Sequence, residues 1–334
     1  MTYVAACMQE PREGPRRILV IDADLEAPGV SFWLDEVNRP TVSFVQLLEG
    51  LHYPPAGIDA TLDFFAEELH KTSLSVSGIQ RELFVLPAAL DLAKIQDMPV
   101  TPEHLARNPD NLWQLSDHLH ALGQRVGADA VFIDLRAGLS ELASPILFDP
   151  RVDHFFVSTV APQSVQGMAE VLRRLHASNR WLPAKRQGDA RPTMILSLLT
   201  KDLRETSHYE QAYKLLGAAY PTDDILKEGV QWLEAEFMNT LMSIGSVREA
   251  LDVLPQSSRL FASASEWASA LYGEQPPQLH ASHQQTLAAG VSGFLCVRRC
   301  ETFPRRRSAL ATYRPTRWES RSRYYATAFM NLSS

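Results

Sequence analysis

Short, β-branched apolar runs alternate along the chain with longer segments in which apolar residues return every three or four positions. The short runs predict buried strands, and the longer segments predict amphipathic helices. The strands are expected at 17–22, 82–87, 130–134, 152–159, 193–199 and 250–255. The helices are expected at 42–51, 58–70, 111–126, 164–176, 205–216, 230–244 and 263–272. Strands that alternate with helices predict an α/β fold with a doubly wound, mostly parallel sheet.

Two of the expected strands end in an aspartate, Asp22 in the first and Asp134 in the third. Doubly wound sheets bind ligands beyond the carboxyl ends of their strands, so both side chains fall at the edge where a site is expected. Asp24 follows Asp22 after one residue, and alternation along an extended chain places the two carboxylates on the same side. Such a pair suits a hard cation such as Mg²⁺, held mostly through water. The alternative is that these acids cap a helix or a turn.

The segment after the third strand adds a further candidate group. An apolar strand is expected to end in Asp134, and a turn at Gly138 follows it. An acid at such a strand end is typical of a residue that supports a phosphate-bound Mg²⁺. Arg136 stands between these two residues. Two interpretations of Arg136 are open, a contact with phosphate and an ion pair within the protein.

The composition is that of a globular protein, since 45% of the 334 residues are apolar and 21% are charged. This excludes disorder throughout the chain, collagen and coiled coil. No apolar stretch approaches the roughly 18 residues of a membrane span, and residues 1–8 lack the basic start and cleavage-like end of a secretory signal. The three cysteines, Cys7, Cys296 and Cys300, form no disulfide framework. These features predict a cytoplasmic protein.

Charge is distributed unevenly along the chain. The net charge is −7, but residues 291–334 hold nine arginines against two glutamates, which gives this segment +7 and residues 1–290 a charge of −14. The acidic body argues against nucleic-acid binding. A Pro- and Gln-containing stretch at 273–282 predicts a linker. Residues 273–334 are therefore expected to form a linker and a basic, loosely ordered tail, the alternative being a basic arm that docks on an acidic surface.

Five segments resemble pieces of a known protein family, in sequence and in order. They read ILVIDADLEAPG at 18–29, LFVLPAA at 83–89, AVFIDLRAGLSE at 130–141, DHFFVSTVAPQSVQGMAEVL at 153–172 and VLPQSS at 253–258. The phrase IDADLEAPG is the most specific, and IDLRAGLSE supports it. Together they resemble the MinD/ParA type of P-loop NTPase, in particular bacterial variants whose phosphate loop reads KGGVGR. The resemblance implies that residues 1–272 form a nucleotide-binding domain.

The resemblance also implies ligands, partners and roles. It implies ATP and Mg²⁺ as ligands, and a homodimer that closes on ATP, opens on hydrolysis and is recognised by another protein. Asp22 and Asp134 would hold Mg²⁺, and Asp24 and Asp134 would be the catalytic acids, Asp24 near the attacking water. Asp22, Arg136 and Pro255 would contact the nucleotide, with Pro255 beside the base.

One family feature is absent from these 334 residues, because no glycine-rich phosphate loop and no Gly-Lys-Ser/Thr occurs. By the resemblance, residues 2–8 form the helix that follows such a loop, and 12–17 form the turn after it. The chain is then expected to begin just after the phosphate loop and to lack the family's first strand, which lies beside the strand of Asp134. Two functions stay open. One is a switch ATPase, impaired here and an ATP hydrolase when the N-terminus is restored; the other is a non-catalytic scaffold of the same fold that acts by protein contacts.

Overall fold

The computed structural model of the chain describes residues 1–9, 16–33, 40–76, 79–91, 111–136, 142–149, 151–179, 191–221, 229–237, 243–254, 259–271 and 294–299. The strands are β1 (Arg16–Asp22), β2 (His70–Val76), β3 (Ile79–Leu86), β4 (Ala130–Leu135), β5 (Asp153–Ser158), β6 (Thr193–Leu199), β7 (Gln231–Glu236) and β8 (Phe294–Arg299). The helices are α1 (Thr2–Gln9), η1 (Val30–Trp33), α2 (Phe44–His52), α3 (Ile58–Glu68), α6 (Gln114–Arg125), α7 (Ser144–Leu147), α8 (Pro162–Asn179), α9 (Lys201–Arg204), α10 (Ser207–Ala219), α11 (Val247–Val253) and α12 (Arg259–Leu271). Within these ranges no helix has both the length and the apolarity that crossing a bilayer requires.

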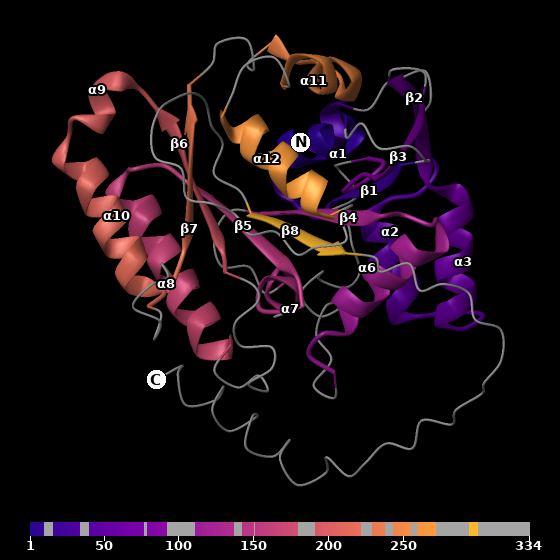
Figure 1. The fold of residues 1–334 in the computed structure, drawn as a ribbon. Coiled ribbons are helices and arrows are strands. Elements are labelled where there is room, and N and C mark those ends of the chain that lie inside the picture. The colour runs from indigo at the N-terminus through magenta and orange to yellow at the C-terminus, as the bar shows by residue number, and fades with distance from the viewer. Residues whose placement is uncertain are drawn as a thin grey trace, which may run out of the picture.

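The strands form one eight-stranded sheet in the order β2-β3-β1-β4-β8-β5-β6-β7. β3, β1 and β4 are parallel neighbours, and so are β5, β6 and β7. β2 runs antiparallel to β3 at one edge, and β8 runs antiparallel to both β4 and β5 in the centre. The expected α/β fold with a doubly wound, mostly parallel sheet is confirmed (Figure 1).

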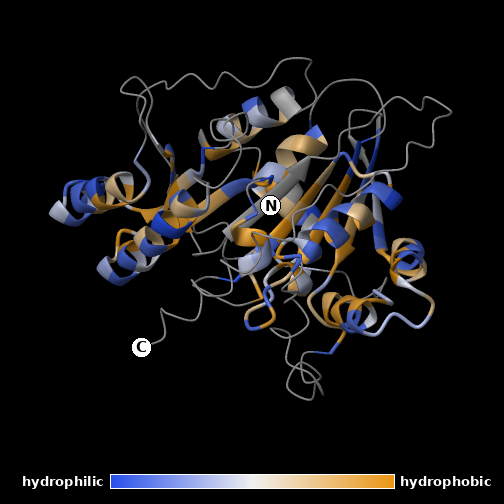
Figure 2. Ribbon diagram, turned by 90° about the horizontal axis from the view of Figure 1, so that it is seen from below, coloured by the Kyte–Doolittle hydropathy of each residue, from blue (hydrophilic) through white to orange (hydrophobic). Residues whose placement is uncertain are grey.

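Helices cover both faces of this sheet. Alternate residues of β1 enter two separate cores. Leu19 and Ile21 join the core formed with α2, α3, α6, α7, α8 and α10, whereas Ile18 and Val20 join the core formed with α1 and α12. These four side chains are at most 2% exposed, because a central strand with helices on both faces is covered on both sides. Figure 2 shows apolar strands in the interior and hydrophilic residues on the outer sides of the flanking helices.

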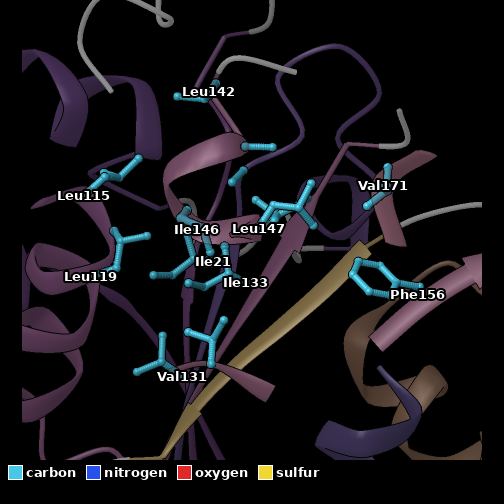
Figure 3. Packing of buried hydrophobic residues seen from close by; sticks show 14 of the residues in the cluster. Ile21, Leu115, Leu119, Val131, Ile133, Leu142, Ile146, Leu147, Phe156 and Val171 are labelled. Atoms are coloured by element: carbon cyan, nitrogen blue, oxygen red, sulfur yellow. The ribbon is translucent and has the colours of Figure 1, made fainter. Parts of the chain in front are cut away.

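The larger core supports the carboxyl ends of β1 and β4. Ile21 and Ile133, which directly precede the two aspartates of these strands, lie close to Ile146 and Leu147 of α7 and to Leu119 of α6 (Figure 3). All five side chains are 2% exposed or less. Close packing of this kind holds a backbone in place, so the two strand ends form a rigid base for whatever lies beyond them.

Two elements near the edges of the sheet differ from the sequence expectation. The helix expected at 230–244 is replaced over Gln231–Glu236 by strand β7, which pairs in parallel with β6. Strand β2 was not expected, and it pairs along its whole length with β3. Both are edge strands with many polar residues, and such strands lack the continuous apolar run that marks the central ones.

The strand expected at 250–255 is also wrong, because residues 247–253 form helix α11. Two hydrogen bonds cap the start of the helix: Glu249 N donates to Ser246 Oγ at 3.1 Å, and the amide of Gly245, which precedes the N-cap Ser246, donates to Glu249 Oε2 at 2.9 Å. A Ser-x-x-Glu signature of this kind starts a helix even where the residues that follow are β-branched.

Residues 294–299 form strand β8, within the segment 273–334 for which a linker and a loosely ordered tail are expected. β4 and β5 do not pair with each other, so each presents a row of backbone donors and acceptors that needs a partner. β8 pairs with both, and its Leu295 stands in register with Asp134. It thus lies beside β4 on the side away from β1. The other residues of 273–334 lie outside the described ranges, and the domain boundary at 272 stays a prediction.

Candidate functional site

The carboxyl ends of β1 and β4 bring two aspartates together. Asp22 and Asp134 are register partners on adjacent parallel strands, which lie about 4.8 Å apart. A hydrogen bond from Ala23 N to the Asp134 carbonyl oxygen, 2.9 Å long, continues the pairing beyond the end of β1. The juxtaposition expected from the sequence is confirmed, whereas the metal and catalytic roles assigned to these residues stay predictions.

Asp22 is fully buried, and donors surround its carboxylate. Oδ2 accepts hydrogen bonds from the backbone N and the Oγ of Ser31, each 2.8 Å long, and Oδ1 accepts a longer one from Asp24 N at 3.3 Å. Burial raises the pKa of Asp22 above its ordinary value, and the hydrogen bonds from Ser31 and Asp24 oppose that rise. The carboxylate is therefore held in one orientation by groups of its own chain.

Asp24 stabilises the turn that follows β1. Its Oδ1 accepts hydrogen bonds from Glu26 N at 3.1 Å and from Ala27 N at 3.0 Å, which is the geometry of an Asx turn. Asp24 thus caps a turn, as the alternative interpretation expected, and it does so through one oxygen. The other oxygen, Oδ2, has no hydrogen-bond partner in the described part of the chain, and the side chain is only partly buried.

Asp134 has the least engaged carboxylate of the three. No described residue donates a hydrogen bond to it, although its backbone carbonyl is bonded. Burial, followed by the negative charge of Asp22, raises the pKa of Asp134 to about 7; the α-amino group of Met1 acts in the opposite direction, and Asp24 adds to the rise. A carboxylate in this state gains most from a cation placed beside it.

Arg136 forms an ion pair with Glu26 in the turn after β1. The ion pair ties the loop that follows β4 to the loop that follows β1, and both side chains are largely exposed. Of the two interpretations open from the sequence, the structure shows the ion pair, and a phosphate contact by Arg136 stays a prediction. Pro255, the residue expected beside a base, lies outside the described residues.

Ser31 is the site residue that sequence reasoning missed. It lies in the turn η1 and contacts Asp22 through both its amide and its hydroxyl, while its Oγ accepts a hydrogen bond from Ala88 N at 2.9 Å. These partners lie 9 and 57 positions away in the sequence. The only local signal was the turn at Pro28 and Gly29, after which a serine is unremarkable.

The donor chemistry fits Mg²⁺ better than it fits a phosphate chain. Asp24 and Asp134 have oxygens without partners among the described residues, and carboxylates that share a Mg²⁺ with several waters are its usual protein ligands. Among the residues of known placement, no group of three or more His, Cys, Asp or Glu converges to hold a metal. Water or phosphate oxygens would therefore supply most of the coordination.

Comparison with known proteins gives a distant similarity in structure. No protein-family model and no curated protein matches the chain. Among solved structures, the chain is similar to pNOB8 ParA, described in a complex with nonspecific DNA: the TM-score is 0.46 and the identity 17%, over 81% of this chain and 92% of that chain. At this level of similarity, the function has to be argued from the residues of the chain itself.

Proposed function

We propose that the chain is a nucleotide-dependent switch of the MinD/ParA type, with its site beyond the carboxyl ends of β1 and β4. One observation carries the proposal: Asp22 and Asp134 lie in register at the carboxyl ends of two adjacent central strands, and Asp24 comes two residues after Asp22. In a doubly wound sheet this is the edge where ligands bind. The motifs IDADLEAPG and IDLRAGLSE, which contain these acids, support the same assignment.

In this proposal the three acids have different tasks. Asp134 and Asp22 would hold Mg²⁺, and Asp24 would act near the attacking water. Mg²⁺, when bound, neutralises charge on the phosphates of ATP. Arg136 reaches the phosphates only if it leaves Glu26, since the two are paired in the structure. The switch is a cytoplasmic homodimer that another protein recognises in its ATP state.

Metal binding tests the proposal most directly. Electron paramagnetic resonance of Mn²⁺, used as a substitute for Mg²⁺, should show a bound fraction that Asp134→Asn reduces strongly. Asp129→Asn is the matched control, because Asp129 is also a partly buried aspartate, directly precedes the opposite end of the same strand and accepts a hydrogen bond from Arg17 N at 3.0 Å. Equal loss in both variants, or none in either, would refute the assignment.

Calorimetric titration with ATP and Mg²⁺ tests the nucleotide part. We expect binding weaker than micromolar, because the sequence has no glycine-rich loop to cradle the phosphates. Micromolar binding that survives Asp134→Asn would place the nucleotide elsewhere. If neither Mn²⁺ nor ATP binds, the alternative of a non-catalytic scaffold gains support, which the internal partners of Asp22 and the Arg136–Glu26 pair already favour.

A further inference from the structure

A directional series of hydrogen bonds leads from helix α2 to the buried carboxylate of Asp22. Phe44 N donates to the carbonyl oxygen of Pro87 at 2.7 Å. Ala88 N donates to Ser31 Oγ at 2.9 Å, and Ser31 Oγ donates to Asp22 Oδ2 at 2.8 Å. The Pro87 carbonyl and the Ala88 amide belong to one peptide group, so the series is continuous.

Every donor in this series points towards Asp22. The lone pair of Ser31 Oγ accepts from Ala88 N, and its proton is donated to the carboxylate, so the hydroxyl has a single consistent orientation. Hydrogen bonds aligned in this way polarise one another, most strongly where water is scarce. Asp22 and Phe44 are fully buried, and Ala88 is buried as well.

The far end of the series is the start of a helix. Phe44 is the first residue of α2 after the N-cap Ser43, so its amide carries part of the positive end of the helix dipole. A second contact, from Val45 N to the Ala88 carbonyl oxygen at 3.1 Å, fixes the same turn of α2 to the same peptide segment. The first turn of α2 is thus attached to the segment after β3, whose Ala88 amide donates to Ser31.

We propose that Ser31 is a positioning residue, which orients Asp22 and couples its charge to the first turn of α2. Ser31 donates two hydrogen bonds to Asp22 Oδ2. Oδ1 accepts only one long hydrogen bond, from Asp24 N, and is therefore the oxygen that can contact a ligand. The coupling itself is a property of the ligand-free chain. Its use as a signal of site occupancy rests on the proposed function.

Amide proton shifts in the full ¹⁵N-labelled chain test the coupling without any ligand. Ser31→Ala should move the Ala88 amide proton upfield, because it loses its acceptor, and Ser31→Thr should restore it. Asp22→Asn keeps the shape but removes the charge, and it should move both the Ala88 and the Phe44 protons upfield. Ser178→Ala is the control. It removes a serine hydroxyl that donates to the Arg174 carbonyl oxygen, far in sequence from Phe44 and Ala88, and it should leave both signals in place.

The outcomes separate a positioning role from a merely structural one. If Asp22→Asn leaves Ala88 and Phe44 unchanged, the charge of Asp22 does not reach α2 and the proposal is wrong. If Ser31→Ala leaves the Ala88 proton unchanged, the Ser31 contact does not carry the series. Asp22→Asn and Ser31→Thr are close in volume to the native residues, so they keep the test available even where Ser31→Ala does not fold.

A Mg²⁺ titration of the same samples distinguishes failure of the coupling from failure of the proposed function. In the native chain Mg²⁺ should shift the Phe44 and Ala88 signals. Ser31→Ala should weaken the binding of Mg²⁺ roughly tenfold, as loss of an outer hydrogen-bond partner does at metal sites. Shifts near Asp134 without any at Phe44 would overturn the coupling. No response to Mg²⁺ anywhere, with the ligand-free shifts as expected, would overturn the metal site and leave Ser31 as the residue that orients Asp22.

Discussion

Three carboxylates at one edge of the sheet differ in how far the protein itself engages them. The Asp22 carboxylate accepts three hydrogen bonds, that of Asp24 accepts two through one oxygen, and that of Asp134 accepts none from the described residues. The carboxylate of Asp22 is thus stabilised by hydrogen-bond donors, whereas only the charge of the Met1 α-amino group favours the ionised form of Asp134. Any energetic penalty from crowding acids at this edge falls mainly on Asp134.

The stability of the chain should reflect this penalty in its pH dependence. The pKa of Asp134 is raised from 3.8 to about 7 in the folded state, so the folded state binds a proton more tightly than the unfolded one. The contribution of that proton is fully present below pH 4 and is lost as the pH rises through 7. Relative to Asp134→Asn, the native chain should therefore lose on the order of 2 kcal/mol in the free energy of unfolding between pH 5 and 8, as Asp134 loses its proton. Water screens the partly exposed group and keeps the loss to this size. Urea unfolding at both pH values measures this, and parallel curves for the two proteins would contradict it.

At the scale of elements, the edge strand β7 is held by charge as much as by pairing. Glu236 is fully buried, and Arg204 Nη1 of α9 contacts its Oε1 at 2.6 Å. Arg204 Nη2 lies 3.2 Å from Glu234 Oε2, and the hydroxyls of Tyr209 and Tyr213 donate to Glu234 Oε1. These contacts join β7 to the helices that precede it.

Removal of the Arg204 side chain should strongly destabilise the fold. Arg204→Ala leaves the Glu236 carboxylate buried without its cation, and we expect a loss of about 3–5 kcal/mol in the free energy of unfolding. Arg173→Ala is the matched control, because Arg173 pairs with Glu170 at 3.1 Å on an exposed face of α8 and should change stability by less than about 1 kcal/mol. Chemical denaturation compares the two variants. Similar losses in both would show that the Arg204–Glu236 pair is not the main link between β7 and α9.

The same contacts explain where sequence reasoning succeeded and where it stopped. The apolar runs of β1 and β4 predicted both strands and the meeting of their terminal aspartates, because a buried parallel strand leaves a local pattern. The strand at β7 left no such pattern, since Glu234 and Glu236 are compensated by residues 21 to 32 positions away. Ser31 was hidden for the same reason: its role depends on a partner that only the fold brings near.

At the scale of the whole molecule, the sheet has two halves joined through β8. β2, β3, β1 and β4 form one half, and β5, β6 and β7 form the other. No ladder links β4 directly to β5 in the described structure. The integrity of the sheet therefore depends on six residues from the basic C-terminal segment.

Limited trypsin digestion tests this arrangement. Arg298 and Arg299 pair with Val131 and Ala130 of β4, so both peptide bonds should resist cleavage as long as β8 stays in the sheet. Val297→Pro should expose them, because proline removes a backbone donor from a strand that pairs on both sides. Arg17 of β1 is an internal reference for an arginine within a strand. Early cleavage after Arg298 in the native chain would support the expectation of a loosely ordered tail.

The central position of β8 has a consequence for biosynthesis. Between β5 and β8 the ribosome makes α8, β6, α9, α10, β7, α11 and α12, and during that time β4 and β5 have no partner on their facing edges. Contacts between segments so distant in the chain form late and slowly. A nascent chain therefore exposes two strand edges to its neighbours until β8 emerges, and for that interval it is a natural client for chaperones.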